Sequence, residues 1–119
     1  MSDQAHYLAV FTSDKTGPRW RAWYAMTEEE QRATDAAGVA AVAEWEAKHR
    51  DSIVYGGGAL GPTKRLTEEG LADIINLLTV FMVVRAPSHD AAARLFEGHP
   101  HITIWPCDGV EVMPVMVGA

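Results

Sequence analysis

The chain has 119 residues, a length that suits one domain able to bury a sizeable core without disulfides or a structural metal. It is 48% hydrophobic and 22% charged, as soluble globular proteins are, and its single cysteine, Cys107, excludes an internal disulfide framework. A net charge of −6, with basic residues scattered among acidic ones, argues against nucleic acid as a partner.

The N-terminal residues show neither the basic segment nor the apolar stretch of a secretory signal. The longest apolar run, residues 77–84, is far shorter than the ~20 residues that a membrane-spanning helix requires. We therefore expect a cytoplasmic protein with no membrane partner, organised as one domain over residues 1–119.

The first half of the chain predicts a strand, a loop and a long helix. Residues 7–13 are rich in strand-forming side chains, and residues 14–26 are expected to form a loop. A helix is predicted over 27–49, because Thr27 fits the N-cap and Glu30 stands where its carboxylate can complete a capping box.

A second strand is predicted to begin at 53–55 and to run into the glycines of 56–61, and 62–70 to form a connection with strand-like pieces. The strongest strand pattern covers 77–85. The glycines spell G-x-G-x-x-G, but no helical pattern follows that could receive a pyrophosphate. They instead indicate a bulge or a closely packed backbone.

A second helix is predicted over 90–97, with Ser88 as its N-cap and Gly98 just past its end. The fourth strand is predicted over 109–117, and Pro114 within it favours a sheet edge. The order β-α-β-β-α-β is typical of the α+β ferredoxin-like fold, a four-stranded antiparallel sheet with two helices on one face.

Both faces of the strand at 77–85 are apolar, whereas two helices can cover only one face of such a sheet. The uncovered face would expose more apolar surface than monomers usually tolerate. We therefore expect a homodimer in which two copies pack sheet against sheet.

Several segments together carry a family resemblance: WYAMTEEE (23–30), GGALG (57–61), SHDAA (88–92), FEGHPH (96–101) and GVEVMPV (109–115). The chain resembles the YCII-related proteins of the dimeric α+β barrel superfamily over most of its length. That resemblance implies the fold and the dimer. Most members have no assigned activity, and relatives in the superfamily include lactone isomerases, dehalogenases, haem-degrading enzymes and small monooxygenases.

His99 and His101 flank a proline after the second predicted helix. His99 is either a general acid/base or a residue that only ends this helix, and the sequence leaves both roles open. If the segment is extended, His101 shares its face, but the chain offers no third ligand at typical spacing, so we expect no metal site. Asp108 is either a turn residue or a partner that orients one of the histidines.

The predicted loop holds Arg19, Trp20 and Trp23, a pattern that suits an aromatic pocket with a cation for a carboxylate. The alternative is that these aromatic side chains cover the dimer interface or the helix end. Trp105 suits either a core position or a pocket wall.

We therefore expect a small enzyme, without a cofactor, that acts on a small organic acid, lactone or enol. In that hypothesis His99 moves a proton, Asp108 or His101 orients it, and Arg19 or Arg21 holds a carboxylate. The alternative is a non-catalytic dimer that binds a small molecule or another protein through the same cleft.

Overall fold

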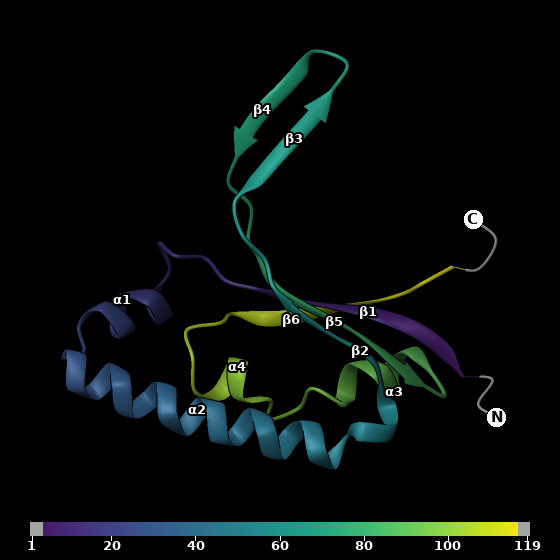
Figure 1. Ribbon diagram of the computed structural model, residues 1–119, viewed down its shortest axis with the longest axis horizontal. Helices are drawn as coiled ribbons and strands as arrows, with labels where there is room; N and C mark the ends of the chain where they lie inside the picture. Colours follow the sequence, from purple (N-terminus) through teal and green to yellow (C-terminus); the bar gives the residue numbers. More distant parts are fainter. Residues whose placement is uncertain (1–3, 117–119) are drawn as a thin grey trace.

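In the computed structural model, which describes residues 4–116, four strands form one antiparallel sheet in the order β2-β5-β1-β6 (Figure 1). The strands are β1 (Ala5–Thr12), β2 (Ile53–Ala59), β5 (Leu78–Ala86) and β6 (Gly109–Pro114). This is the predicted α+β, ferredoxin-like arrangement, with β5 internal and the proline-bearing β6 at an edge. The predicted final residue of β6, Val117, lies outside the described residues.

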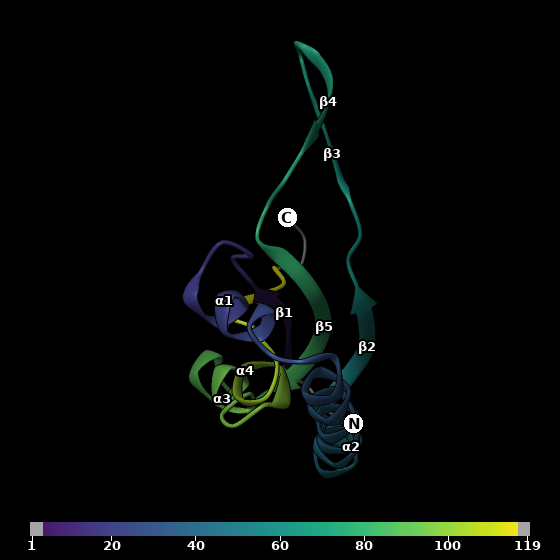
Figure 2. The same cartoon turned by 90° about the vertical axis from the view of Figure 1, so that its left-hand side faces the viewer.

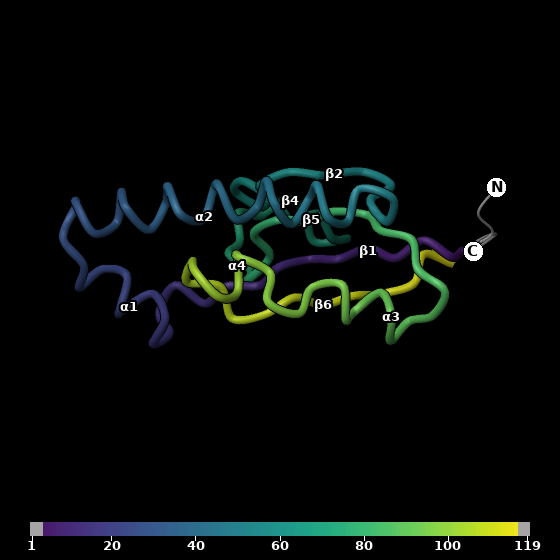
Figure 3. Tube along the Cα trace, turned by 90° about the horizontal axis from the view of Figure 1, so that it is seen from below, coloured from purple at the N-terminus to yellow at the C-terminus, as the bar shows by residue number. Residues whose placement is uncertain are grey.

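Helices cover one face of the sheet, as Figures 1 and 3 show. They are α1 (Pro18–Tyr24), α2 (Glu28–Lys48), α3 (His89–Arg94) and α4 (Pro100–Thr103), with a 3₁₀ turn η1 at Arg50–Ser52. The predicted capping box of α2 is confirmed: the Thr27 hydroxyl accepts from the Glu30 N–H, and the Glu30 carboxylate accepts from the Thr27 N–H. No helix of the described part is both long and apolar enough to cross a membrane.

One prediction for the connections was wrong, and another was incomplete. The expected loop at 14–26 contains helix α1, which starts at Pro18 because proline at a first helical position forfeits no intrahelical hydrogen bond. The connection expected at 62–70 is instead a β-hairpin, β3 (Thr63–Thr67) with β4 (Gly70–Ile74), that forms its own two-stranded sheet. The strand-like pieces there pair locally with each other.

The second predicted helix is shorter than expected. Helix α3 ends at Arg94, and the residues up to Gly98, whose φ is +72°, lead into the separate short helix α4. Pro100 is the first residue of that helix. The step from His99 to Pro100 thus starts a helix, since proline is compatible with the first position of a helix.

The core lies between the sheet and the helices. Alternate residues of β1 and β5 point toward the helices, because side chains of a strand alternate between its two faces. The buried apolar cluster consists of Tyr7, Ala9, Phe11, Met82, Val84, Ala86, Trp45, Ala92, Phe96 and Cys107.

The other face of the sheet is apolar too, and no described helix covers it (Figure 1). On that face Leu8 of β1 lies opposite Val83 of β5, and Val10 lies opposite Phe81, as the strand pairing and alternation require. Tyr55 and Met113 extend the face at its two edges, and both are exposed. We call this surface the open face.

The glycines of β2 form the close backbone approach that the sequence predicted. Gly57 has a φ of +67°, and the strand register shifts between Tyr55 and Gly58, which marks a bulge. A Cβ on Gly57 would lie 1.8 Å from the carbonyl oxygen of Phe81. The chain after Gly61 enters β3 rather than a helix, which leaves no helix N-terminus for a dinucleotide.

Candidate functional site

His99 stands at the beginning of a helix. Pro100 is the first residue of α4, and the Nδ1 atom of His99 accepts a hydrogen bond from the backbone N–H of His101 at 3.1 Å. The imidazole thus satisfies one of the N–H groups that a helix start leaves unpaired. A structural role for His99 is therefore present, in the helix that follows it rather than the helix that precedes it.

His99 lies inside the aromatic core. Its side chain is 2% exposed, and its ring centroid lies 4.8 Å from that of Phe11 and 4.6 Å from that of Trp45. Burial, with smaller contributions from the neighbouring His101 and His49, lowers the pKa of His99 to about 3. The ring is neutral at pH 7, and since Nδ1 accepts a hydrogen bond, we assign its proton to Nε2.

His101 continues the stack toward the surface. Its ring lies 5.0 Å from that of His99 on one side and 5.0 Å from that of Trp105 on the other. The side chain is half-buried, and this burial lowers its pKa below the ordinary value. His101 is therefore an uncharged imidazole at neutral pH, and it is less enclosed than His99.

Trp105 is fixed by helix α2. Its Nε1–H donates to the carboxylate of Asp35 at 2.7 Å, and its indole lies directly over Gly38. A Cβ on Gly38 would come within 2.4 Å of the ring, so the glycine makes room for the indole. Sequence analysis did not find Asp35 and Gly38 as site residues, because both are 67 or more positions away from Trp105 in sequence.

A cavity of about 200 Å³ lies between α1 and the segment that follows α4. Its lining residues are Arg19, Ala22, Trp23, Met26, Thr103, Ile104, Trp105 and Pro106. We call it the α1 cavity. An Arg19 Nη1–H donates to the carbonyl of Ile102 at 2.7 Å. This bond uses one of the guanidinium N–H groups and does not involve the others. Three predicted site residues, Arg19, Trp23 and Trp105, thus line one cavity, and the third of them is stacked on His101.

Trp20 and Asp108 bond elsewhere. The Trp20 Nε1–H donates to the buried hydroxyl of Ser13, and that hydroxyl donates to the carbonyl of Pro106 at 2.6 Å. The Asp108 carboxylate accepts from the N–H of Asp14 at 2.7 Å. Both side chains thus hold the loop after β1, and neither hydrogen bond involves His99 or His101.

Among residues 4–116, no cluster of three or more histidine, cysteine, aspartate or glutamate side chains could hold a metal ion.

The thiol of Cys107 is buried, and burial raises its pKa. Its S–H donates to the Thr12 carbonyl at 3.2 Å. An uncharged, buried thiol is a poor nucleophile.

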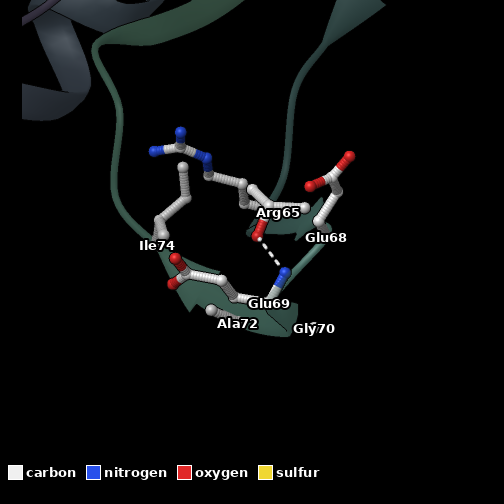
Figure 4. Close-up of a pocket in the computed structure, with 7 residues that line it drawn as sticks. Arg65, Glu68, Glu69, Gly70, Ala72 and Ile74 are labelled. Atoms are coloured by element: carbon white, nitrogen blue, oxygen red, sulfur yellow. Dashed lines mark hydrogen bonds between the residues drawn. The ribbon is translucent and has the colours of Figure 1, made fainter.

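Two further hollows lie along the hairpin β3–β4. One, of about 520 Å³, is enclosed by residues 13–16 and by the base of the hairpin at 60–63 and 74–78. The other is a concave surface on the hairpin itself, where Arg65, Glu68 and Glu69 lie around Ala72 and Ile74 (Figure 4). This surface mixes one cation with two carboxylates, so it does not select an ion of either sign.

No family model matches the chain, and no curated protein sequence matches it. Its structure is similar to that of the 5-chloro-2-hydroxyhydroquinone dehydrochlorinase TftG from Burkholderia phenoliruptrix AC1100, solved in complex with 2,5-dihydroxybenzoquinone. The TM-score is 0.55 at 15% sequence identity, and the alignment covers 95% of each chain. At this identity the similarity establishes the shared α+β fold.

Proposed function

We propose that the protein is a YCII-related enzyme that moves a proton on a small enolic or hydroxylated acid, without a cofactor. The observation that carries the proposal is the stack of two uncharged histidines, whose outer member packs on a tryptophan of the α1 cavity. An imidazole that is unprotonated at neutral pH is ready to accept a proton.

In this proposal His101 is the base and His99 is a positioning residue. The sequence analysis expected the opposite, with His99 as the group that moves the proton. His99 is almost fully enclosed, and its Nδ1 already accepts a hydrogen bond from His101 N–H. It therefore has little freedom to meet a substrate, but it holds the backbone and the ring of His101 in place. Asp108 is assigned to holding the loop after β1.

Arg19, Trp23 and Trp105 would supply substrate binding. A guanidinium can hold a carboxylate or an enolate by charge-assisted hydrogen bonds, and indole walls suit a flat, partly apolar molecule. All three residues line the α1 cavity. Trp20 would support the cavity indirectly, because its indole N–H binds the hydroxyl of Ser13, directly after β1, and so holds the segment that leads into α1.

The similar structure supports this substrate class. TftG is a dehydrochlorinase of a chlorinated hydroxyhydroquinone, a small ring compound with acidic hydroxyl groups. Its fold therefore accommodates chemistry on small hydroxylated molecules. A fold hosts many reactions, so the substrate class is argued from the α1 cavity, and the comparison adds to it.

We also propose a homodimer in which the open faces of two copies pack together. Besides its apolar residues, the open face carries one cation, Arg85, and one carboxylate, Glu111, opposite His6 and Val10 of β1. The Nε of Arg85 is buried, and it has no hydrogen-bond partner among the described residues. A surface with both charges can complement itself around a two-fold axis.

The first prediction tests the proposed base. In a panel of small carboxylates, lactones and hydroxylated quinols, we expect wild-type protein to bind and turn over a member of the panel. The His101→Phe variant keeps the stacked ring but has no nitrogen, so it should retain the ligand-induced rise in melting temperature. Its turnover should fall by about 10²–10⁴-fold, the usual contribution of a general base.

A pair of arginine variants serves as the matched control. Arg19→Ala should raise KM, whereas Arg21→Ala, on the same helix but not lining the α1 cavity, should leave it unchanged. Undiminished turnover in His101→Phe would refute the role of the histidine. Binding by the wild type without turnover of any compound would instead support the non-catalytic, ligand-binding dimer.

A further inference from the structure

The hairpin β3–β4 projects away from the rest of the molecule. Figures 1 and 2 show it extending on the side of the sheet opposite the helices, and its strands pair with each other as a separate sheet. The radius of gyration is 16.2 Å, whereas a compact chain of this length has about 13.5 Å. We call residues 61–75 the arm.

The arm exposes large apolar side chains without a visible reason in the single chain. Leu66 and Leu71 are paired across the two strands, and they are 77% and 66% exposed. Ile75, at the base, is 97% exposed. A two-stranded hairpin alone is marginally stable in water, and the surface ion pair of Lys64 with Asp73 adds little. The arm therefore needs a partner surface.

The direction of the arm indicates which surface that is. It extends from the open face, the side on which a second copy would stack. Stacked sheets lie about 10 Å apart, whereas seven extended residues, such as 61–67, span about 23 Å. The arm of one copy would therefore reach past the sheet of its neighbour.

The contact area points the same way. Four strands about 4.8 Å apart and about seven residues long give an open face of about 450 Å². A stable dimer usually buries about 800 Å² of accessible surface on each partner, and a contact of the arm would add to the surface that this footprint offers. Between the leucine pair and this face lie Lys64 and Asp73, on the same side of the hairpin, and then the exposed Ile75, Leu77 and Leu78.

We propose that β3–β4 is a dimer arm that packs its Leu66–Leu71 side against a second copy of this chain. The inference rests on the proposed stacking of the open faces and adds to it a distinct contact. In such a dimer the second copy also covers the hollow at the base of the arm, whose wall includes the exposed Ile75. The charged, concave side of the arm, with Arg65 and Glu69, faces solvent (Figure 4).

The test is the dimer dissociation constant of full-length variants, measured by sedimentation over a range of concentrations. The double variant Leu66→Lys/Leu71→Glu removes the apolar contact but keeps an opposite-charge pair across the hairpin, as at Lys64 and Asp73. We expect the dissociation constant to rise at least tenfold. The control variant Arg65→Ser/Glu69→Ser, on the other side of the arm, should leave it unchanged.

A second measurement does not depend on any variant. In hydrogen exchange of the wild type, amides of residues 63–74 should gain protection when the concentration rises through the dissociation constant. A wild-type dimer that the leucine variant leaves intact, with no gain in arm protection, would overturn the arm and leave the stacked dimer standing. A wild type that stays monomeric would overturn both.

Discussion

His99 shows how a single residue type takes its role from its surroundings. A histidine in water has a pKa near neutrality, but the rings of Phe11 and Trp45 exclude the water that would solvate its charged form. The uncharged ring then serves as a hydrogen-bond acceptor at the start of α4. Its neighbour His101 is closer to the surface, and it is the base in the proposed function.

The second prediction concerns acid stability. His99 binds a proton readily when the chain is unfolded but has a pKa of about 3 in the fold. Between about pH 6.5 and pH 3 the unfolded state therefore binds more protons, so this group makes stability fall as the pH falls. It contributes a slope of up to about 1.4 kcal/mol per pH unit to the free energy of unfolding.

The variant His99→Asn removes this titration while asparagine can still cap α4. Its free energy of unfolding, from urea titrations at pH 7 and pH 5, should depend less on pH than that of the wild type. An unchanged slope in His99→Asn would show that His99 titrates normally.

At the scale of elements, strand β2 depends on one glycine among several. Gly57 combines a positive φ with a carbonyl contact that a Cβ would violate, whereas Gly58 has neither constraint. The bulge at Gly57 lies within β2, and Gly58 and Ala59 beyond it still pair with Phe81 and Val80 of β5. One backbone conformation thus lets the strand keep its pairing with β5 on both sides of the bulge.

The third prediction follows from this bulge. Gly57→Ala should lower the free energy of unfolding by more than about 2 kcal/mol, since it adds left-handed backbone strain to a clash with the Phe81 carbonyl. Gly58→Ala should change it by less than about 1 kcal/mol. Urea denaturation measures both. Equal effects at the two positions would contradict the bulge as described.

At the scale of the whole molecule, the open face carries two charges that one copy cannot pair. Arg85 lies opposite His6, and Glu111 lies opposite Val10 one strand further on. The backbone positions of Arg85 and Glu111 are four residues apart along the strands and two strands apart across the sheet. This separation is about 16 Å, which is beyond the reach of an ion pair. The two charges lie diagonally across Leu8, the centre of the face, so a two-fold axis there can bring Arg85 near Glu111 of the second copy.

The last prediction is a charge exchange. Arg85→Glu and Glu111→Arg should each weaken the dimer, because each places like charges together in the interface. The double variant, with both charges reversed, should regain most of the lost affinity, as measured by sedimentation. A double variant weaker than either single variant would show that these residues do not meet across the interface.

Most of the fold was predictable because its rules are local. Strand-forming side chains identified the four strands of the sheet, Thr27 and Glu30 identified the start of α2, and Pro114 indicated an edge strand. Proline was the ambiguous signal. Pro18 begins a short helix in a segment expected to be a loop. Pro100 begins another, directly after the histidine that could have ended the preceding helix.

The sequence by itself determined the sheet, the helix-covered face and the apolar character of the other face, since each depends on residues close together along the chain. Only the tertiary structure decided the surroundings of His99, His101 and Asp108 and the direction of the arm. The pKa of His99 depends on burial beside Trp45, 54 positions earlier, and the bond of Asp108 goes to Asp14. Such properties arise from contacts between distant segments, which no local pattern records.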